Sequence, residues 1–383
     1  MKLLFACVVA LAASFSALAQ TPQPPEVAAK SWLLIDITAD QVLAEAQADV
    51  KSDPASLTKL MTAWLIFDAL RQKKLSLEQT LPVSLRAWSE RKGGGSLMFI
   101  DPKMTPTVNE LLRGMIAVSG NDAAVALAEG VAGSLDNFVG MMNRQAAAWG
   151  LKATQFKNVT GLTEPGHYST ARELGAIAAH VLRDFPEQYA AYYAIRQYSF
   201  NGIRQDNRNM LLGRDPSVDG MKTGYTDAAG YCLIASAVRE LPNGRRRLLS
   251  VVMGANSREA RAAESQKLLN WGYSAWDAVR LFEAGTPAVT VPVWKGSTPT
   301  AALGAASALV VAVPRGEGDK LRTLIERTDP LVAPLVKGQR VGKILVSTGN
   351  GVLLATVPLV VQVPVEQAGL LGRAWDSIRL WIK

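Results

Sequence analysis

Cysteine and histidine are scarce in this chain of 383 residues, which holds two of each. Two cysteines exclude a disulfide-built scaffold, because such proteins are dense in cysteine. Two histidines exclude a histidine-rich metal site. The chain also lacks the low hydrophobicity of disordered proteins, since 49% of its residues are hydrophobic and 19% are charged. At this length the composition predicts two or three folded domains.

The sequence has no run of basic residues, although its charge is mildly basic. Against 33 Asp+Glu residues there are 41 Lys+Arg residues, and the formal net charge is +8. Because these cations are spread along the chain, they favour contact with an anionic surface over recognition of nucleic acid. We therefore expect no nucleic acid among the partners.

Residues 1–19 are predicted to be a secretory signal peptide. Lys2 precedes an apolar run from Leu3 to Leu18, and Ala17-Leu18-Ala19 has the small-x-small pattern of a cleavage site. The run is shorter than the ~20 residues of a membrane-spanning helix, which favours cleavage over a retained anchor. Cleavage leaves Cys232 as the one cysteine, in an apolar strand-like run where a buried structural role is expected.

The mature chain begins with a proline-rich leader, 20–27. The segments 32–37 and 42–44 flank a polar turn and predict a β-hairpin. Helical periodicity then predominates, over 57–70, 108–130, 135–149 and 171–183. Two further strands, 230–239 and 245–255, are joined by the hairpin signal Leu241-Pro242-Asn243-Gly244, and a helix follows over 257–276. This order predicts an α+β domain, residues 28–282, with helices packed on an antiparallel sheet.

The composition changes near residues 280–287. Beyond them, Gly and Pro punctuate short valine-rich runs, at 289–293, 309–313 and 359–363. We expect a small all-β domain over residues 283–365.

The tail, residues 366–383, changes period again. Leu371, Trp375, Ile378 and Ile382 recur at the spacing of one helix face. An amphipathic helix with aromatic and basic flanks is suited to a membrane interface, and this is the favoured interpretation. The alternative is a helix docked on its own domain.

Ser56 and Lys59 are three residues apart at the predicted start of an apolar helix. Residues at this spacing share a helix face, so their side chains would be neighbours. Burial disfavours a charged ammonium, and a neutral lysine can accept the proton of a serine nucleophile. Alone the pattern is weak, since about one or two matches arise by chance in such a chain. An exposed serine beside a solvated lysine is the alternative.

Two further patterns follow, each unconvincing alone. Ser119 and Asn121 lie between two apolar segments, where they can relay a proton and offer an amide. Lys222, Thr223 and Gly224 precede a predicted strand. They can supply a positive charge, a hydrogen bond to a substrate carboxylate, and room for a peptide to approach the backbone. The alternatives are a polar turn between helices and a basic residue in a β-turn.

In the order Ser-x-x-Lys, Ser-x-Asn and Lys-Thr-Gly, the patterns resemble those of β-lactamases and penicillin-binding proteins. Segments such as Gly161-Leu162-Thr163-Glu164 and Asn201-Gly202-Ile203-Arg204-Gln205 extend the resemblance from about Ala28 to the C-terminus. The chain is similar to low-molecular-mass penicillin-binding proteins that are serine-type D-alanyl-D-alanine carboxypeptidases (peptidase S11). This resemblance implies a β-lactamase-like transpeptidase domain, an all-β C-terminal domain and a membrane-associated terminal helix.

The resemblance also implies a role for each residue. Ser56 would be the nucleophile, Lys59 its base, and Ser119 a relay of the proton to the leaving group. The backbone N–H groups of Ser56 and Tyr225 would form the oxyanion hole. Many relatives have histidine where this chain has Tyr225, and a backbone donor survives that change. The residues implied to bind substrate are Asn121, Lys222, Thr223, Gly224 and Arg208.

The implied reaction removes the terminal D-alanine from peptidoglycan stem pentapeptides through an acyl-enzyme on Ser56, which β-lactams would also acylate. It requires no metal and no organic cofactor, and neither His167 nor His180 is required for it. The implied location is the periplasm, with peripheral attachment to the outer face of the bacterial inner membrane. The alternatives are a D,D-endopeptidase, a β-lactamase with Glu164 as the candidate deacylating residue, and a non-enzymatic wall-binding module.

Overall fold

The computed structural model describes residues 21–242 and 244–382. The predicted signal peptide lies outside the described residues, and residues 21–27 of the leader form neither helix nor strand. The chain divides into two compact units. The larger comprises Pro24–Glu283 with Ala308–Ala312, and the other includes Ala284–Ser307 and the chain from Val313 onwards.

A five-stranded antiparallel sheet forms the centre of the larger unit, in the order β2-β1-β7-β6-β5. Its strands are β1 (Ser31–Asp36), β2 (Gln41–Ala46), β5 (Val218–Thr226), β6 (Gly230–Leu241) and β7 (Gly244–Ala255). Both predicted hairpins are confirmed, since β1 pairs with β2 and β6 with β7. β5 is the last strand in this order, so within the described part of the chain one of its edges has no strand beside it.

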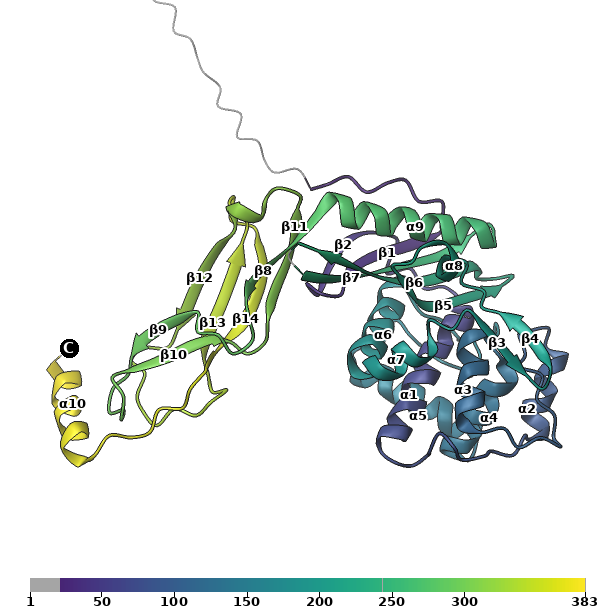
Figure 1. Cartoon of the computed structure of the whole chain (residues 1–383), viewed down its shortest axis with the longest axis horizontal. Helices are drawn as coiled ribbons and strands as arrows, with labels where there is room; N and C mark the ends of the chain where they lie inside the picture. Colours follow the sequence, from purple (N-terminus) through teal and green to yellow (C-terminus); the bar gives the residue numbers. More distant parts are fainter. Residues whose placement is uncertain (1–20, 243, 383) are drawn as a thin grey trace, which may run out of the picture. The chain divides into compact units, whose positions relative to one another are not determined.

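Different helices cover the two faces of this sheet (Figure 1). On one face lies α9 (Arg258–Ala275). On the other lie α1 (Lys59–Arg71), α3 (Val108–Ala117), α4 (Asn121–Ala132), α5 (Leu135–Ala148), α6 (Ala171–Asp184) and α7 (Pro186–Tyr192). Side chains alternate along a strand, so Leu248 packs with the α9 cluster and Leu249 with the helices opposite. The predicted α+β class, with helices on an antiparallel sheet, is confirmed.

Cys232 on β6 belongs to the core between the sheet and the larger group of helices. It is fully buried, and burial raises the pKa of its thiol to about 11. A thiol with so high a pKa is protonated at neutral pH and chemically inert. The expected structural role of this cysteine is confirmed.

The predicted helical segment 108–130 is in fact two helices. Val118, Ser119 and Gly120 separate α3 from α4, and Ser119 adopts a left-handed conformation with φ of +63°. Hydrophobic periodicity did not reveal the break, because both helices bury apolar residues in the same core. Shorter elements were not predicted: α2 (Leu85–Ser89), η2 (Glu90–Lys92), β3 (Gln197–Phe200), β4 (Ile203–Asp206) and α8 (Leu211–Arg214).

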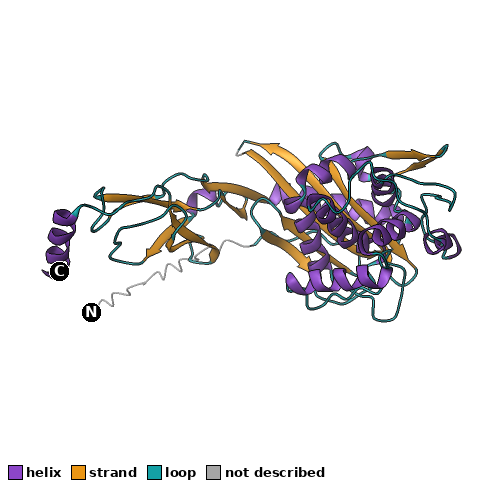
Figure 2. Ribbon diagram, turned by 90° about the horizontal axis from the view of Figure 1, so that it is seen from below, coloured by secondary structure: helices purple, strands orange, loops and turns teal. Residues whose placement is uncertain are grey.

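The second unit is rich in strands, as predicted. Its five-stranded sheet has the order β12-β13-β14-β10-β9, and Figure 2 shows this part of the chain as strands and loops that lead to a terminal helix. The elements are β9 (Val289–Pro292), β10 (Thr300–Ala305), η3 (Gly318–Lys320), β12 (Arg322–Arg327), β13 (Arg340–Ser347), β14 (Leu353–Val361) and α10 (Leu370–Ile382).

One strand of the expected all-β domain counts with the larger unit. β11 (Leu309–Pro314) pairs with β8 (Trp276–Phe282). The side chain of Gln41 also donates to Ala312 O at 3.3 Å and accepts from Ala312 N at 2.6 Å. These bonds explain why residues 308–312 group with the larger unit although they lie beyond the composition change.

Among the described residues, no helix has the length and apolar character needed to cross a membrane.

Candidate active site

Ser56 and Lys59 lie where α1 begins. Ser56 is part of a short 3₁₀ turn, η1 (Ala55–Thr58), and Lys59 is the first residue of α1. α1 is apolar on nearly every face, so its first turn is buried: Lys59 is 1% exposed, whereas Ser56 is half-buried. Lys59 Nζ lies 3.0 Å from Ser56 Oγ. The two side chains are neighbours, as their spacing predicts.

Two other acceptors surround the Lys59 amine. Nζ donates to Asn121 Oδ1 and to Thr160 O, each at 2.7 Å. Burial lowers the pKa of Lys59 to about 7, although the charge of Glu90 acts in the opposite direction. A neutral amine has two hydrogens, which these acceptors take, and one lone pair, which is then left for the hydroxyl of Ser56. The site can therefore deprotonate the serine near neutral pH.

Ser119 and Asn121 lie near Ser56 and Lys59, at the break between α3 and α4. Ser119 is buried, and its Oγ accepts a hydrogen bond from Lys222 Nζ at 2.9 Å. The buried carboxylate of Asp122, which the sequence analysis did not single out, accepts from three successive backbone N–H groups, those of Met98, Phe99 and Ile100. Asp122 thereby ties the start of α4 to the chain segment beside the site.

β5 contributes the third motif. Burial lowers the pKa of Lys222 well below its ordinary value, and the nearby charges of Lys59, Arg208 and Arg261 act in the same direction. A Cβ at Gly224 would lie 3.0 Å from Ala55 Cβ and 3.2 Å from Ser56 N. The missing side chain is what allows β5 to pack this closely against η1.

These elements enclose a cleft of about 320 Å³. It brings together most of the predicted residues, namely Ser56, Ser119, Asn121, Arg208, Thr223, Gly224 and Tyr225. Lys59 and Lys222 are buried behind this lining. Tyr225 is half exposed, and its ring centroid lies 4.3 Å from that of Tyr231.

The cleft also has residues for which sequence reasoning assigned no role: Gly94, Gly95, Ser96, Gly161, Leu162, Thr226, Tyr231, Arg258 and Arg261. Arg261, on α9, is the most informative of them. Its guanidinium donates to Gly224 O at 3.0 Å and to Arg208 O at 3.3 Å, so it fixes the backbone of two predicted residues. No local pattern marks it, because its partners lie 37 and 53 residues away in sequence.

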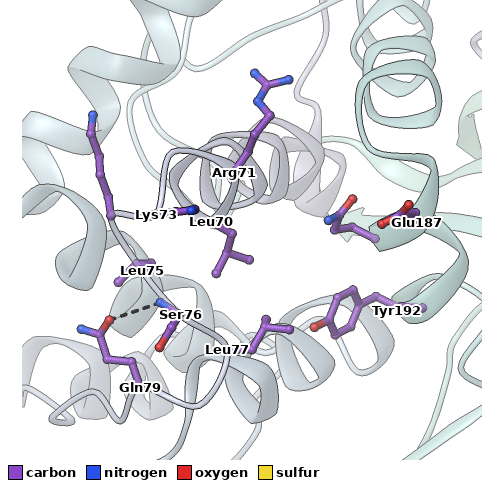
Figure 3. Close-up of a pocket in the computed structure, with 12 residues that line it drawn as sticks. Leu70, Arg71, Lys73, Leu75, Ser76, Leu77, Gln79, Glu187 and Tyr192 are labelled. Atoms are coloured by element: carbon purple, nitrogen blue, oxygen red, sulfur yellow. Dashed lines mark hydrogen bonds between the residues drawn. The ribbon is translucent and has the colours of Figure 1, made fainter.

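A larger cavity, of about 820 Å³, lies between the end of α1, the chain that follows it, and α7. Figure 3 shows side chains such as Leu70, Leu77 and Tyr192 around it. None of the three motifs contributes to its lining. We therefore place the candidate active site in the smaller cleft, where the predicted groups meet.

Comparison with known proteins gives a consistent result. A family model described as D-alanyl-D-alanine carboxypeptidase (peptidase S11) matches residues 18–257, and one described as the C-terminal domain of penicillin-binding protein 5 matches residues 276–367. The chain is 42% identical over 366 residues to D-alanyl-D-alanine carboxypeptidase DacC of Escherichia coli (strain K12), an alignment that covers 94% of this chain and 90% of the relative. It is 41% identical over 364 residues to DacA of the same strain, with coverage of 94% and 89%.

Solved structures are similar too. Penicillin-binding protein 5 from Haemophilus influenzae superposes with a TM-score of 0.83 at 38% identity, over 90% of this chain and 100% of that one. Penicillin-binding protein D2 from Listeria monocytogenes, in its ampicillin-bound form, has a TM-score of 0.56 at 31% identity, over 66% of this chain and 100% of its own.

Gly161 offers a test of how tightly η1, the turn that contains Ser56, is held. Its φ is +87°, and a Cβ there would lie 1.8 Å from Ala55 O. Gly161→Ala should lower the free energy of unfolding by about 3 kcal/mol, because the backbone of η1 must move. Gly133→Ala is the matched control, since Gly133 has φ of +73° with nothing within 4 Å, and should cost about 1 kcal/mol. Urea unfolding measures both, and equal losses would contradict the close approach.

Proposed function

Because the chain belongs to the D-alanyl-D-alanine carboxypeptidase family, we propose that Ser56 is its acylated nucleophile and Lys59 the base that activates it. The protein is a serine-type D-alanyl-D-alanine carboxypeptidase that acts on peptidoglycan and binds penicillin. The observation that carries the residue assignment is the 3.0 Å contact between Lys59 Nζ and Ser56 Oγ. It occurs at a cleft that residues of all three motifs line.

Acylation begins when Ser56 Oγ attacks the carbonyl carbon between the two terminal D-alanines and its proton passes to the neutral amine of Lys59. The backbone N–H groups of Ser56 and Tyr225 stabilise the negative charge on the carbonyl oxygen. The C–N bond then breaks and D-alanine leaves after its nitrogen gains a proton. Water hydrolyses the ester on Ser56, which releases the shortened peptide and restores the serine.

Ser119 is suited to deliver the proton to the leaving nitrogen. Its Oγ already accepts a hydrogen bond from Lys222, so its own O–H is available to donate into the cleft. Lys222 can replace that proton. Asn121 has a different part, because its side-chain oxygen holds the Lys59 amine and its side-chain nitrogen remains for the substrate.

The charge of the cleft suits a substrate with a free carboxylate. Arg208, Arg258 and Arg261 line it, and no acidic residue is found among the described residues of its lining. We assign the terminal carboxylate to Thr223 and Arg208, with Lys222 close behind. A bound carboxylate would balance the positive charges of the cleft. It would thereby raise the pKa of Lys222 toward its ordinary value.

The β-lactamase alternative receives no support from Glu164. This residue is exposed, its Oε2 accepts a hydrogen bond from Asn158 Nδ2 at 3.0 Å, and it does not line the cleft. A deacylating carboxylate must reach the water beside the ester. We therefore expect the penicilloyl ester to persist.

Ser56→Ala tests the nucleophile. Without Oγ no acyl-enzyme can form, so release of D-alanine from a stem pentapeptide should fall by at least about 10³-fold. Labelled penicillin should attach to Ser56 in the wild type, as mapped by mass spectrometry of the digested protein. No peptide of the variant should carry the label. The segment Ser199-Phe200-Asn201 also matches Ser-x-Asn, so Ser199→Ala is the control and should behave as wild type. A label on a different residue would refute the assignment.

The protonation of Lys59 predicts how acylation depends on pH. Its pKa is about 7, and only the neutral amine accepts the serine proton. The second-order rate of acylation by labelled penicillin should therefore fall about tenfold for each pH unit below 7 and level off above it. A series of rates between pH 5 and 9 measures this. A rate that is constant between pH 5 and 7 would exclude Lys59 as a base with this pKa.

We propose further that α10 lies in a membrane interface. Several of its apolar side chains are exposed: Leu371 is 89% exposed, Trp381 88% and Trp375 62%. Its polar side makes the contacts, because Asp376 Oδ2 accepts from Lys295 N at 2.6 Å and the Arg379 guanidinium lies 5.4 Å from the ring of Trp294. Docking through the polar side leaves the apolar side free to enter lipid.

With the predicted signal peptide, this supports export to the periplasm and peripheral attachment to the outer face of the inner membrane. Trp375→Glu should reduce binding of the mature protein to phosphatidylethanolamine–phosphatidylglycerol vesicles at least about tenfold, because a large apolar group is lost and a charge is added. Ser377→Glu adds the same charge without removing an apolar group and should cost far less. Co-sedimentation measures both, and equal losses would argue for a purely electrostatic attraction.

A further inference from the structure

A loop between Lys157 and His167, here called the 157–167 loop, packs against the turn that carries Ser56. Thr160 O in this loop accepts a hydrogen bond from Lys59 Nζ at 2.7 Å. The Cα of Gly161 comes so close to the backbone of Ala55 that no side chain could be accommodated. The loop thus contacts Ala55, the first residue of η1, and Lys59, the first residue of α1.

His167, at the end of this loop, makes a third contact. The side chain is 3% exposed, and its Nδ1 accepts a hydrogen bond from the backbone N–H of Lys157 at 3.0 Å. Since Nδ1 is an acceptor, the ring hydrogen of the neutral imidazole is on Nε2. Nε2 lies 2.8 Å from Thr58 Oγ1, so the imidazole donates to the threonine hydroxyl.

The neutral form of this imidazole is also the one its surroundings favour. Burial lowers the pKa of His167 to about 4, while the charges of Glu164 and Asp53 act in the opposite direction. The ring packs edge-on against Phe156, with centroids 5.9 Å apart. The donor to Thr58 is therefore in place throughout the neutral pH range.

Thr58 lies between the nucleophile and its base in sequence, and it is 1% exposed. It is the last residue of η1 and directly precedes the first residue of α1. A rotation of the backbone at this position would move Ser56 relative to Lys59. A hydrogen bond to the side chain of Thr58 opposes such a rotation.

We propose that His167 is a positioning residue for acylation, which holds Thr58 through its Nε2–H so that Ser56 Oγ stays within hydrogen-bond reach of Lys59 Nζ. The inference rests on the proposed function, in which Ser56 is the nucleophile. His167 does not line the cleft, so it does not contact the substrate. Its loss should therefore slow the acylation step and leave the preceding non-covalent binding almost unchanged.

The expected effect is considerable for one hydrogen bond. Misplacement of a reacting group by ~1 Å can cost about 100-fold in rate. Because Thr160 and Gly161 still hold the turn, we expect removal of the His167 bond to slow acylation about tenfold.

The experiment compares His167→Leu, Thr58→Val and the double variant, using labelled penicillin under stopped-flow conditions. The dependence of the rate on penicillin concentration separates the acylation rate constant from the dissociation constant of the non-covalent complex. Each single variant should lower the rate constant about tenfold and change the dissociation constant less than twofold. The double variant should be no slower than the singles, because both substitutions remove the same bond.

Conservative replacements test the direction of the hydrogen bond. His167→Gln keeps an N–H donor at the reach of Nε2 and should restore most of the rate. The side chain of His167→Asn is shorter, so its amide reaches only the position of Nδ1 and should not restore the rate. His180→Leu is the matched control. That histidine lies on α6, stacked on Trp149 at 3.9 Å, and its replacement should leave acylation within twofold of wild type.

The proposal is wrong if His167→Leu acylates at the wild-type rate, if the two single effects multiply in the double variant, or if Gln is no better than Leu. Should His167→Leu fail to fold, Thr58→Val must still slow acylation about tenfold and His167→Gln must keep most of the wild-type rate, and either result to the contrary refutes the proposal. Ser56→Ala is run in parallel. If that variant still takes the label, the proposed function has failed independently of His167.

Discussion

The hydrogen-bonded contact between Ser56 and Lys59 requires an amine that is shielded from water and oriented by other groups. Its acceptors come from separate parts of the chain, Asn121 at the start of α4 and Thr160 in the 157–167 loop. Burial of Lys59 in an apolar helix brings its pKa close to neutrality. The helical core, the break between α3 and α4, and the packing of β5 on η1 all serve to keep this contact in place.

The charged side chains around that contact are mostly basic. Two buried lysines and three arginines lie at the cleft, while its described lining offers no carboxylate. Burial is the main cause of the lowered pKa values of both lysines, and for Lys222 the neighbouring cations lower the pKa further. A ligand that ends in a carboxylate would relieve this imbalance of charge where it binds.

Much of the framework was predictable because it depends on short-range patterns. The pairing of β6 with β7 has a local turn signal in the sequence, and the helices over 135–149 and 171–183 follow their apolar periodicity to within one residue. Where a feature depends on distant partners, prediction failed. Ser119 interrupts a segment whose apolar periodicity is continuous. β11 pairs with β8, which lies before the change in composition, and Arg261 contacts the cleft from α9 without a sequence pattern that marks it.

The sequence alone determined that a serine and a lysine share one helical turn, that two more motifs follow in a recognisable order, and that the chain ends in an amphipathic helix. These are properties of neighbours in the chain. Only the tertiary structure decided that Lys59 is buried among acceptors, that Ser119 takes its hydrogen bond from Lys222, and that His167 supports Thr58. Burial and hydrogen bonding across about 100 residues of sequence arise when separate elements pack, and no local pattern encodes them.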